Sequence, residues 1–210
     1  MFDGILFDLD GTLWNAVPQV AKSWTLGLEQ LGIRRAPITS EELFPCMGLL
    51  LPDIVARLLP ELPPERMEEV ISHCCAVEND HLARHGAELY PGAEEALASL
   101  SKKYSLFVVS NCEKGYIEAY FQGSGMGKYF TDFESAGNTG LPKSENIGLV
   151  IRRNGLKKPV YVGDTPLDHR SASQAGVPFV HAAYGFGRVE EVPAIQSLGE
   201  LEGLLEELGR

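Results

Sequence analysis

Two aspartates separated by one residue lie at the far end of the first apolar run of the chain. Residues 2–9 are rich in Ile, Leu and Phe, which is typical of a strand buried on both faces. Asp8 lies near the end of this run, and Asp10 lies just beyond it, before Gly11. Residues two apart on a strand share one face, roughly 6.6 Å apart, and a glycine after them lets the chain turn sharply. The two carboxylates can therefore face one small cavity.

Paired carboxylates of this kind suit a reaction that needs a metal ion and a proton carrier. Two like charges raise one another's pKa unless a cation lies between them, and a site with oxygen ligands only favours Mg²⁺. One carboxylate can then attack while the other holds a proton for the leaving group. The alternative is a solvated Asp-Gly turn, but the string Asp8-x-Asp10-Gly11-Thr12 arises by chance at roughly one position in 10⁵.

A second pair of aspartates follows a later apolar run, at residues 159–162. Asp164 lies at the tip of this predicted strand, and Asp168 follows one helical turn later. Ligands of an open parallel sheet bind beyond the carboxyl ends of its strands, so Asp164 lies beside Asp8 if their strands are neighbours. Asp168 is also typical of a helix cap, because an aspartate there accepts backbone N–H groups and complements the helix dipole.

Three further residues could hold an anion. Ser110 and Asn111 end the apolar run 106–109 and offer a hydroxyl and backbone N–H groups. Lys143 lies in the loop before a predicted helix at 144–154 and offers a positive charge for a phosphate. A capping serine and a solvated surface lysine are the alternatives for Ser110 and Lys143.

The sequence between the first strand and residue 88 has the periodicity of helices. Apolar residues recur at helical spacing through residues 14–87, and Asn15 is the expected N-cap of the first helix. This stretch contains no convincing strand. We therefore expect residues 14–87 to form an all-helical cap inserted after the first strand.

From residue 88 onward, predicted strands alternate with predicted helices, and the last helix is expected at about 195–208. Such alternation predicts βαβ units and a parallel sheet covered on both faces. The predicted fold class is α/β, with a doubly wound, Rossmann-like core. Residues 1–13 and 88–210 are expected to form this core catalytic domain.

The composition excludes several classes of protein. The 210 residues are 44% hydrophobic and 22% charged, which is ordinary for a globular protein. The formal net charge of −11 repels a phosphate backbone, so we expect no nucleic-acid partner. No run approaches the ~18 apolar residues of a membrane span, so we expect no membrane partner. The absence of an export signal and four cysteines outside any CxxC pair predict a cytoplasmic protein with reduced thiols.

The stretch from Phe7 to Leu13 resembles the first motif of the haloacid dehalogenase (HAD) superfamily of hydrolases. The four motifs of that family follow in order along the chain: Asp8-Leu9-Asp10-Gly11-Thr12, Val109-Ser110-Asn111, Lys143, and Gly163-Asp164 with Asp168. The helical stretch resembles the small helical cap of the family, and residues 48–52 resemble its loop that leans toward the substrate. The resemblance covers essentially the whole chain and is greatest to the phosphoglycolate phosphatase branch.

The resemblance implies roles for these residues. Asp8 would be the nucleophile that forms an aspartyl-phosphate, and Asp10 would protonate the leaving alkoxide and later deprotonate the attacking water. Mg²⁺ would be held by Asp8, the backbone carbonyl of Asp10 and Asp164. Asp168 would support these ligands without binding the ion itself. The transferred phosphoryl group would be held by three residues: Ser110, the Asn111 backbone and Lys143.

We therefore expect a Mg²⁺-dependent phosphatase that hydrolyses a small soluble phosphomonoester, phosphoglycolate phosphatase-like, with the oligomeric state left open. Asp10 argues against dehalogenation, which has no alkoxide to protonate. A sugar phosphomutase of the same superfamily is the nearest alternative, although Asn15 stands where many mutases carry an acidic residue. A non-enzymatic phospho-acceptor or regulatory module is a further alternative, but it has no need of Asp10 or of a cap.

Overall fold

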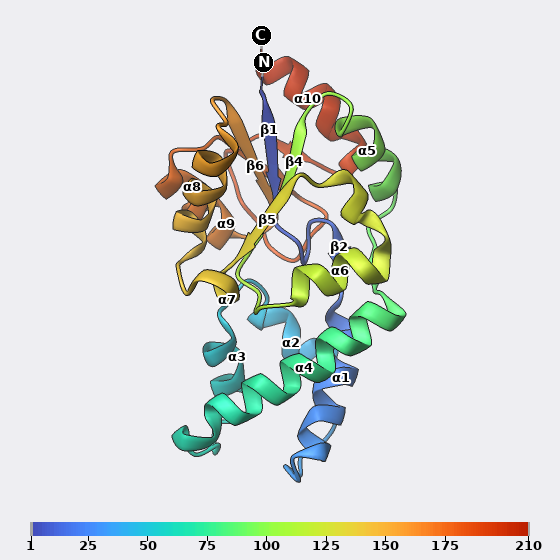
Figure 1. The fold of residues 1–210 in the computed structure, drawn as a ribbon, viewed down its shortest axis with the longest axis vertical. Helices are drawn as coiled ribbons and strands as arrows, with labels where there is room; N and C mark the ends of the chain where they lie inside the picture. Colours follow the sequence, from blue (N-terminus) through green and yellow to red (C-terminus); the bar gives the residue numbers. More distant parts are fainter. Residues whose placement is uncertain (1, 210) are drawn as a thin grey trace.

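The computed structural model of the chain describes residues 2–209. A parallel sheet with helices on both sides forms one part, and helices α1 to α4 form the other (Figure 1). Both chain ends lie at the edge of the sheet far from the helical part (Figure 1). The first strand leads directly into the boundary between the two parts, so residues just after it are placed at that boundary.

The central sheet has six strands in the order β5-β4-β1-β6-β7-β8, and all its neighbouring pairs are parallel. The strands are β1 (Gly4–Phe7), β4 (Ser105–Ser110), β5 (Asp132–Ser135), β6 (Pro159–Gly163), β7 (Phe179–Ala182) and β8 (Ala194–Ile195). Strand β1 lies at the centre, with Phe7 opposite Val108 of β4 and Val162 of β6. The carboxyl ends of these three strands therefore meet at one edge of the sheet, as the sequence analysis required.

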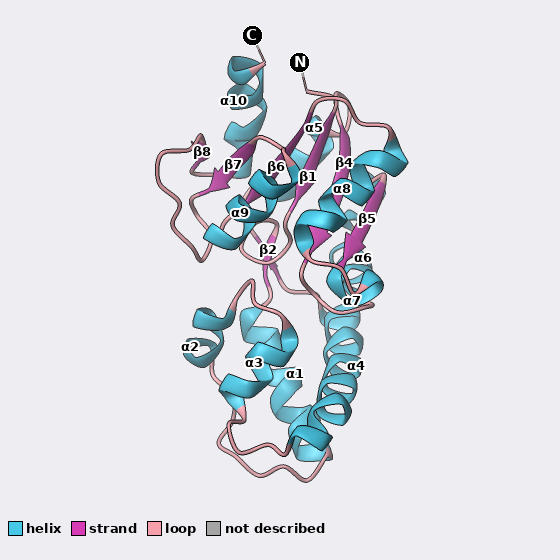
Figure 2. Cartoon of the chain, turned by 90° about the vertical axis from the view of Figure 1, so that its left-hand side faces the viewer, coloured by secondary structure: helices cyan, strands magenta, loops and turns pink. Residues whose placement is uncertain are grey.

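Two layers of helices cover the sheet, and alternate residues of β1 face one or the other (Figure 2). Leu6 packs with residues of α8 (Lys143–Asn154) and α9 (Pro166–Ala175) on one face. Ile5 and Phe7 pack on the other face of the sheet against three other helices. These are α5 (Ala93–Leu100), α6 (Tyr116–Ser124) and α10 (Leu201–Leu208). The doubly wound α/β core predicted from the sequence is thus confirmed.

The shorter helices lie in the connections. These are α7 (Ala136–Thr139) and the 3₁₀ turns η3 (Met126–Tyr129) and η4 (Leu198–Glu200) in the sheet part, with η1 (Phe44–Cys46) and η2 (Pro64–Arg66) in the helical part.

The helical part has a hydrophobic core of its own. It contains α1 (Val17–Gln30), α2 (Ser40–Leu43), α3 (Leu51–Leu58) and α4 (Met67–His85). Val17, Trp24 and Leu28 pack there against residues of the other three helices. Helix α4 also reaches the sheet part, because Gly123 of α6 lies so close to it that a Cβ would collide with the carbonyl of Leu82. The helical part therefore rests on the sheet part through α4 and α6.

The structure differs from the sequence expectations at three places. Trp14–Asn15 (β2) pairs antiparallel with Glu88–Leu89 (β3), so a two-stranded ribbon joins the parts where no strand was expected. Asn15 is not the N-cap of α1, because Ala16 holds that position and the Asn15 side chain accepts from the backbone of Val17 at 3.2 Å. The expected last helix is also too long, since residues 194–195 add the edge strand β8 and α10 begins only at Leu201. The ribbon strands and β8 have two residues each, which is too short for a periodic signal.

Within residues 2–209, no helix has both the length and the apolar character needed to cross a membrane. All four cysteines are free thiols.

Candidate active site

Asp8 and Lys143 form a buried ion pair at the carboxyl end of the central strand. Asp8 follows β1 directly and is 4% exposed, and Lys143 is 3% exposed at the first residue of α8. The lysine Nζ lies 2.8 Å from Oδ1 of Asp8 and 2.6 Å from Oδ1 of Asp168. Lys143 was expected in the preceding loop and as an anion ligand, and the structure places its ammonium group between two carboxylates.

The charge on Asp8 is opposed by its surroundings. Burial and then the negative charge of Asp168 raise the pKa of Asp8, whereas Lys143 lowers it, and the result is a pKa of about 6. The single ammonium therefore does not fully compensate the carboxylates that surround it.

Asp164 lies beside Asp8, as the neighbouring strands β1 and β6 require, and is fully buried. Its Oδ2 accepts from the backbone N–H of Phe186 at 2.7 Å, and its Oδ1 accepts from the Thr12 hydroxyl at 3.4 Å. Gly11 has a φ of +84° and allows this approach, because a Cβ there would collide with the Asp164 carboxylate. Burial, followed by the charges of Asp8 and Asp168, raises the pKa of Asp164 to about 8.

Asp168 takes part in the cap of α9 and also binds Lys143. Its Oδ2 accepts from the backbone N–H of Thr165 at 2.9 Å and from the Thr165 hydroxyl at 2.6 Å, which caps α9. Its Oδ1 accepts from Lys143. The helix cap thus fixes the carboxylate that holds the lysine in place.

The carboxylates of Asp8, Asp164 and Asp168 could hold a divalent cation. One oxygen of each lies within 4.8 Å of the other two, and all three residues are buried. Oxygen donors at this density suit Mg²⁺. The raised pKa values of Asp8 and Asp164 show that positive charge is lacking, so the donor set fits the metal expected from the sequence.

Asp10 points away from this cluster and toward α6. It is half-buried, and its Oδ1 accepts from the hydroxyl of Tyr116 at 2.9 Å. Burial and then the charge of Asp8 raise the pKa of Asp10, whereas the hydrogen bond from Tyr116 lowers it, and the result is a pKa of about 7. A carboxyl group with a pKa near 7 can both give and take a proton at neutral pH.

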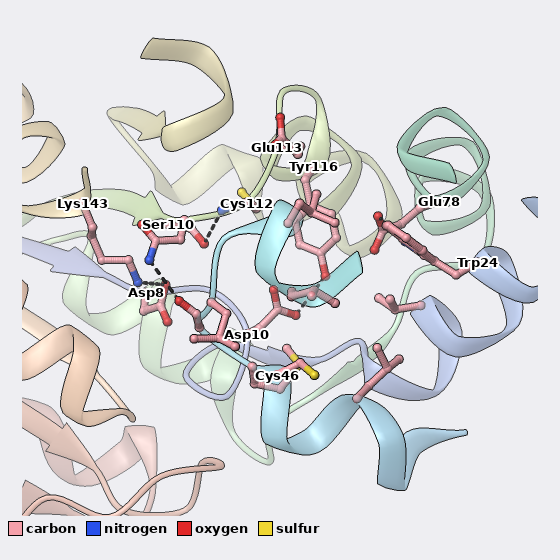
Figure 3. A pocket seen from close by; sticks show the side chains of 18 residues that line it. Asp8, Asp10, Trp24, Cys46, Glu78, Ser110, Cys112, Glu113, Tyr116 and Lys143 are labelled. Carbon is pink, nitrogen blue, oxygen red and sulfur yellow. Dashed lines mark hydrogen bonds and ion pairs between the residues drawn. The ribbon is translucent and has the colours of Figure 1, made fainter. Parts of the chain in front are cut away.

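Ser110 is the last residue of β4 and lies next to Asp8 (Figure 3), and Asn111 follows it and lines the same cavity. Ser110 is 5% exposed, and its Oγ accepts from the backbone N–H of Cys112 at 3.4 Å. The side chain of Asn111 donates to the carbonyl of Gly48 at 3.0 Å, so the predicted anion site touches the helical part directly. Gly48 lies in the loop that was expected to lean toward a substrate.

A cavity of about 90 Å³ joins the two parts of the molecule (Figure 3). Five of the predicted site residues line it on the sheet side: Asp8, Asp10, Ser110, Asn111 and Lys143. The helical part contributes mainly apolar side chains: Val20, Trp24, Leu43, Leu49, Leu51 and Ile54. Asp164 and Asp168 do not line the cavity, although their carboxylates lie close to that of Asp8. The arrangement places the carboxyl groups of Asp8 and Asp10 and the ammonium group of Lys143 at one end of a small compartment.

Two residues of this cavity were missed by the sequence analysis. Tyr116, which holds Asp10, lies on the buried face of α6, where a tyrosine gives no distinct signal. Glu78 lies on the buried face of α4 and lines the cavity. Its position was detectable, because Val70, Cys74, Glu78 and Leu82 are spaced by four and the glutamate interrupts an apolar stripe.

The chain is similar to known proteins in sequence and in fold. Residues 5–182 match the family model of the haloacid dehalogenase-like hydrolases. A phosphoglycolate phosphatase from Aliivibrio fischeri is 26% identical over 200 residues, covering 90% of this chain and 87% of the relative. A phosphoglycolate phosphatase from Pseudomonas fluorescens is 28% identical over 207 residues, covering 91% and 74%.

The fold is also found in solved structures. A hydrolase of the haloacid dehalogenase-like family from Streptococcus pneumoniae superposes with a TM-score of 0.78 at 19% identity, covering 99% of this chain and 97% of that one. At this identity, the likeness concerns the fold, including the helical part inserted after the first strand.

Proposed function

Because the chain belongs to the family of haloacid dehalogenase-like hydrolases, we propose that it is a Mg²⁺-dependent phosphatase of small phosphomonoesters. Phosphatases are among its relatives, and phosphoglycolate, named for two of them, is the first substrate to test. The observation that carries the proposal is the placement of Asp8 and Asp10 at one cavity, with Lys143 bonded to Asp8.

The reaction would proceed in two displacements at phosphorus. An Asp8 oxygen attacks, the bond from phosphorus to the ester oxygen breaks, and Asp10 gives its proton to the departing alkoxide. Asp10 then takes a proton from water, whose oxygen attacks the aspartyl-phosphate, releasing inorganic phosphate and restoring Asp8. Tyr116 orients Asp10 through its 2.9 Å hydrogen bond, and Lys143 keeps Asp8 ionised.

Asp8 and Asp164, with the backbone carbonyl of Asp10, would hold Mg²⁺. When bound, Mg²⁺ draws charge from the phosphate oxygens and so favours attack by an anion. Asp168 would act through Lys143, with which it shares a 2.6 Å contact. Ser110 and the backbone of Asn111 would hold the phosphoryl oxygens at the end of β4.

The helical part would act as a cap over the site. We assign residues 14–87 to the cap and residues 1–13 and 88–210 to the catalytic core. Asn111 donates to the Gly48 carbonyl, and the ring of Phe44 lies 5.8 Å from that of Phe186, so the cap contacts the core at two places besides α4. Such closure excludes bulk water from the reacting groups. A cytoplasmic location is part of the proposal and is supported by the four free thiols.

The direct test is phosphate release from a panel of small phosphomonoesters with Mg²⁺. We expect turnover by the wild type and a loss of about 10²–10⁴-fold in kcat for Asp10→Asn, because the amide still accepts from Tyr116 but carries no proton for the leaving group. An Asp53→Asn variant, exposed on α3, is the matched control and should keep the wild-type rate. Turnover that persists in Asp10→Asn would contradict the assignment, and transfer that needs a bisphosphate activator would indicate the mutase instead.

Stability should report the metal independently of turnover. The pKa values of Asp8, Asp10 and Asp164, about 6, 7 and 8, exceed their ordinary value of 3.8, so the folded protein binds protons more tightly than the unfolded chain. This contribution is fully present below about pH 4 and is lost as the pH rises toward 8. We therefore expect the Tm in EDTA to fall between pH 5 and pH 8.

Mg²⁺ should reverse this loss, because its ligands must be ionised. At about 100-fold excess over its Kd, we expect Tm to rise by roughly 5–10 °C at pH 8 and by less at pH 5. Burial also raises the pKa of Glu78 to about 8, which adds to the pH slope but not to the Mg²⁺ response. An Asp164→Asn variant should lose most of the Mg²⁺ response. A Tm that Mg²⁺ leaves unchanged at pH 8 would argue against the metal site.

A further inference from the structure

A buried carboxyl group faces the cavity from the side opposite Asp8 and Lys143. Glu78 of α4 is 5% exposed and lines the cavity with Asp8 and Asp10. The indole Nε1–H of Trp24 donates to its Oε2 at 3.0 Å. Within the described residues, no hydrogen bond reaches its other oxygen. Figure 3 shows Glu78 and Trp24 together on the cap side of the cavity, across from Lys143 and Ser110.

The cavity around Glu78 lacks a positive charge. Of the described residues that line it, Lys143 is the only one with a cationic side chain, and that cation is bonded to Asp8 and Asp168. Glu113 lines the same cavity and adds a further acidic group. Burial and then the charges of Asp10 and Glu113 raise the pKa of Glu78, which reaches about 8 although the hydrogen bond from Trp24 lowers it; this is the behaviour of a carboxylate without a positive partner.

The position of Glu78 determines what it would contact. The phosphate end of a substrate would lie against Asp8 in the core, so the space between Asp8 and the cap belongs to the leaving group. The cavity of about 90 Å³ holds roughly six water-sized positions, which limits the leaving group to a few atoms. Trp24 and Leu49 give this space apolar walls. The far end of a short leaving group would therefore lie next to Glu78.

Resting on the phosphatase function proposed above, we infer that Glu78 selects phosphomonoesters whose short leaving group ends in an ammonium group and rejects those that end in a carboxylate. An ammonium would supply the missing positive partner to the free oxygen of Glu78, and the Trp24 indole favours a cation beside it. A carboxylate in the same place would be buried among acidic groups with no cation to pair it, which is strongly unfavourable. By this inference, phosphoglycolate is a poor substrate of this enzyme although it is named for the relatives.

Three two-carbon phosphomonoesters of equal length test the inference: phosphoethanolamine, 2-hydroxyethyl phosphate and phosphoglycolate. They differ only in a terminal ammonium, hydroxyl or carboxylate. For the wild type with Mg²⁺, we expect kcat/KM to fall in that order, with about a tenfold or larger difference between the first and the last. This part of the test needs no variant, so it holds even if a substitution at Glu78 impairs folding.

The Glu78→Gln variant removes the charge and keeps the shape and the acceptor for Trp24. We expect kcat/KM to fall for phosphoethanolamine and to rise for phosphoglycolate, so that their ratio shifts by about tenfold or more, while 2-hydroxyethyl phosphate changes little. Glu68→Gln is the matched control, with the same charge change on an exposed site of α4, and should leave the ratio unchanged. Preference of the wild type for phosphoglycolate, or a ratio that Glu78→Gln leaves unchanged, would overturn the inference.

p-Nitrophenyl phosphate separates failure of this inference from failure of the proposed function. If the wild type hydrolyses p-nitrophenyl phosphate or any of the three substrates, the proposed phosphatase function is supported. The inference about Glu78 is then tested only by the order of kcat/KM among the three substrates. If the wild type hydrolyses none of them with Mg²⁺, the proposed function fails, and the inference about Glu78 fails with it.

Discussion

An Asp8→Asn variant should release phosphate about 10⁴-fold or more slowly than the wild type while remaining folded. The amide that replaces the carboxylate cannot attack phosphorus, and Asp10 has no geometry for the attack, because its Oδ1 is held by Tyr116 on the α6 side. Folding should survive, because Lys143 keeps its 2.6 Å contact with Asp168 and one buried negative charge is removed. Initial rates of phosphate release with Mg²⁺, alongside the Tm, measure both effects.

Trapping the covalent intermediate makes the same prediction independent of rates. When turnover is stopped by acid, the wild-type peptide that contains Asp8 should carry the mass of one phosphoryl group, and the Asp8→Asn peptide should carry none. An Asp8→Glu variant keeps a carboxylate but moves it by one methylene, and it should also be inactive, because a displacement of this size misaligns the attack. An Asp8→Asn protein that kept more than about a hundredth of the wild-type rate would indicate direct attack by water and would remove the nucleophile assignment.

Much of the core was predictable because its longer strands carry a complete local signal. The run before Asp8 is apolar on both faces, which only a central strand of a parallel sheet requires, and β1 indeed lies between β4 and β6. The carboxyl ends of three neighbouring strands must meet, so the proximity of Asp8, Ser110 and Asp164 followed from strand order alone. The same logic predicted that Lys143 would lie near this edge, although not that α8 begins with it or that its ammonium binds two carboxylates.

The elements that were missed depend on distant contacts. The ribbon β2–β3 consists of two residues on each side, and it exists because the chain leaves and re-enters the core at adjacent places. Strand β8 is equally short and pairs with β7 at the edge of the sheet. The backbone N–H of Phe186 that holds Asp164 lies in a loop 22 residues away, where no periodicity indicates an element. Contacts of this kind are fixed by the tertiary fold and leave no local trace in the sequence.

Glu78 was missed for a different reason, because its position on the apolar face of α4 is visible in the sequence but does not reveal its role. A glutamate on the apolar stripe of α4 must either find a partner or face a cavity, and the sequence alone does not say which. The structure supplies the answer, because Trp24 satisfies one oxygen and the cavity receives the other. Exceptions to an amphipathic pattern are therefore better guides to specificity than the pattern itself.

Lys143→Met should weaken both catalysis and folding, because the methionine fills a similar space but leaves Asp8 and Asp168 without their shared cation. We expect kcat to fall on the order of 10²–10³-fold, since the positive charge beside the reacting oxygen is lost. Breaking a buried pair by removing one partner costs about 3–5 kcal/mol. In EDTA at pH 8, the free energy of unfolding should fall by this amount, measured by urea titration.

The loss of stability should depend on pH, and its sign separates electrostatics from packing. Lys143 lowers the pKa of Asp8, so without it that pKa rises further above its ordinary value. A carboxyl whose pKa is raised in the folded state stabilises it at low pH and loses that contribution as pH rises. The deficit of Lys143→Met relative to wild type should therefore be largest near pH 8 and smallest near pH 5, and Mg²⁺ should reduce it at pH 8. A Lys22→Met variant, exposed on α1, should show no such deficit. A loss that is equal at both pH values would assign the effect to packing around α8 and not to the charge that Lys143 places beside Asp8.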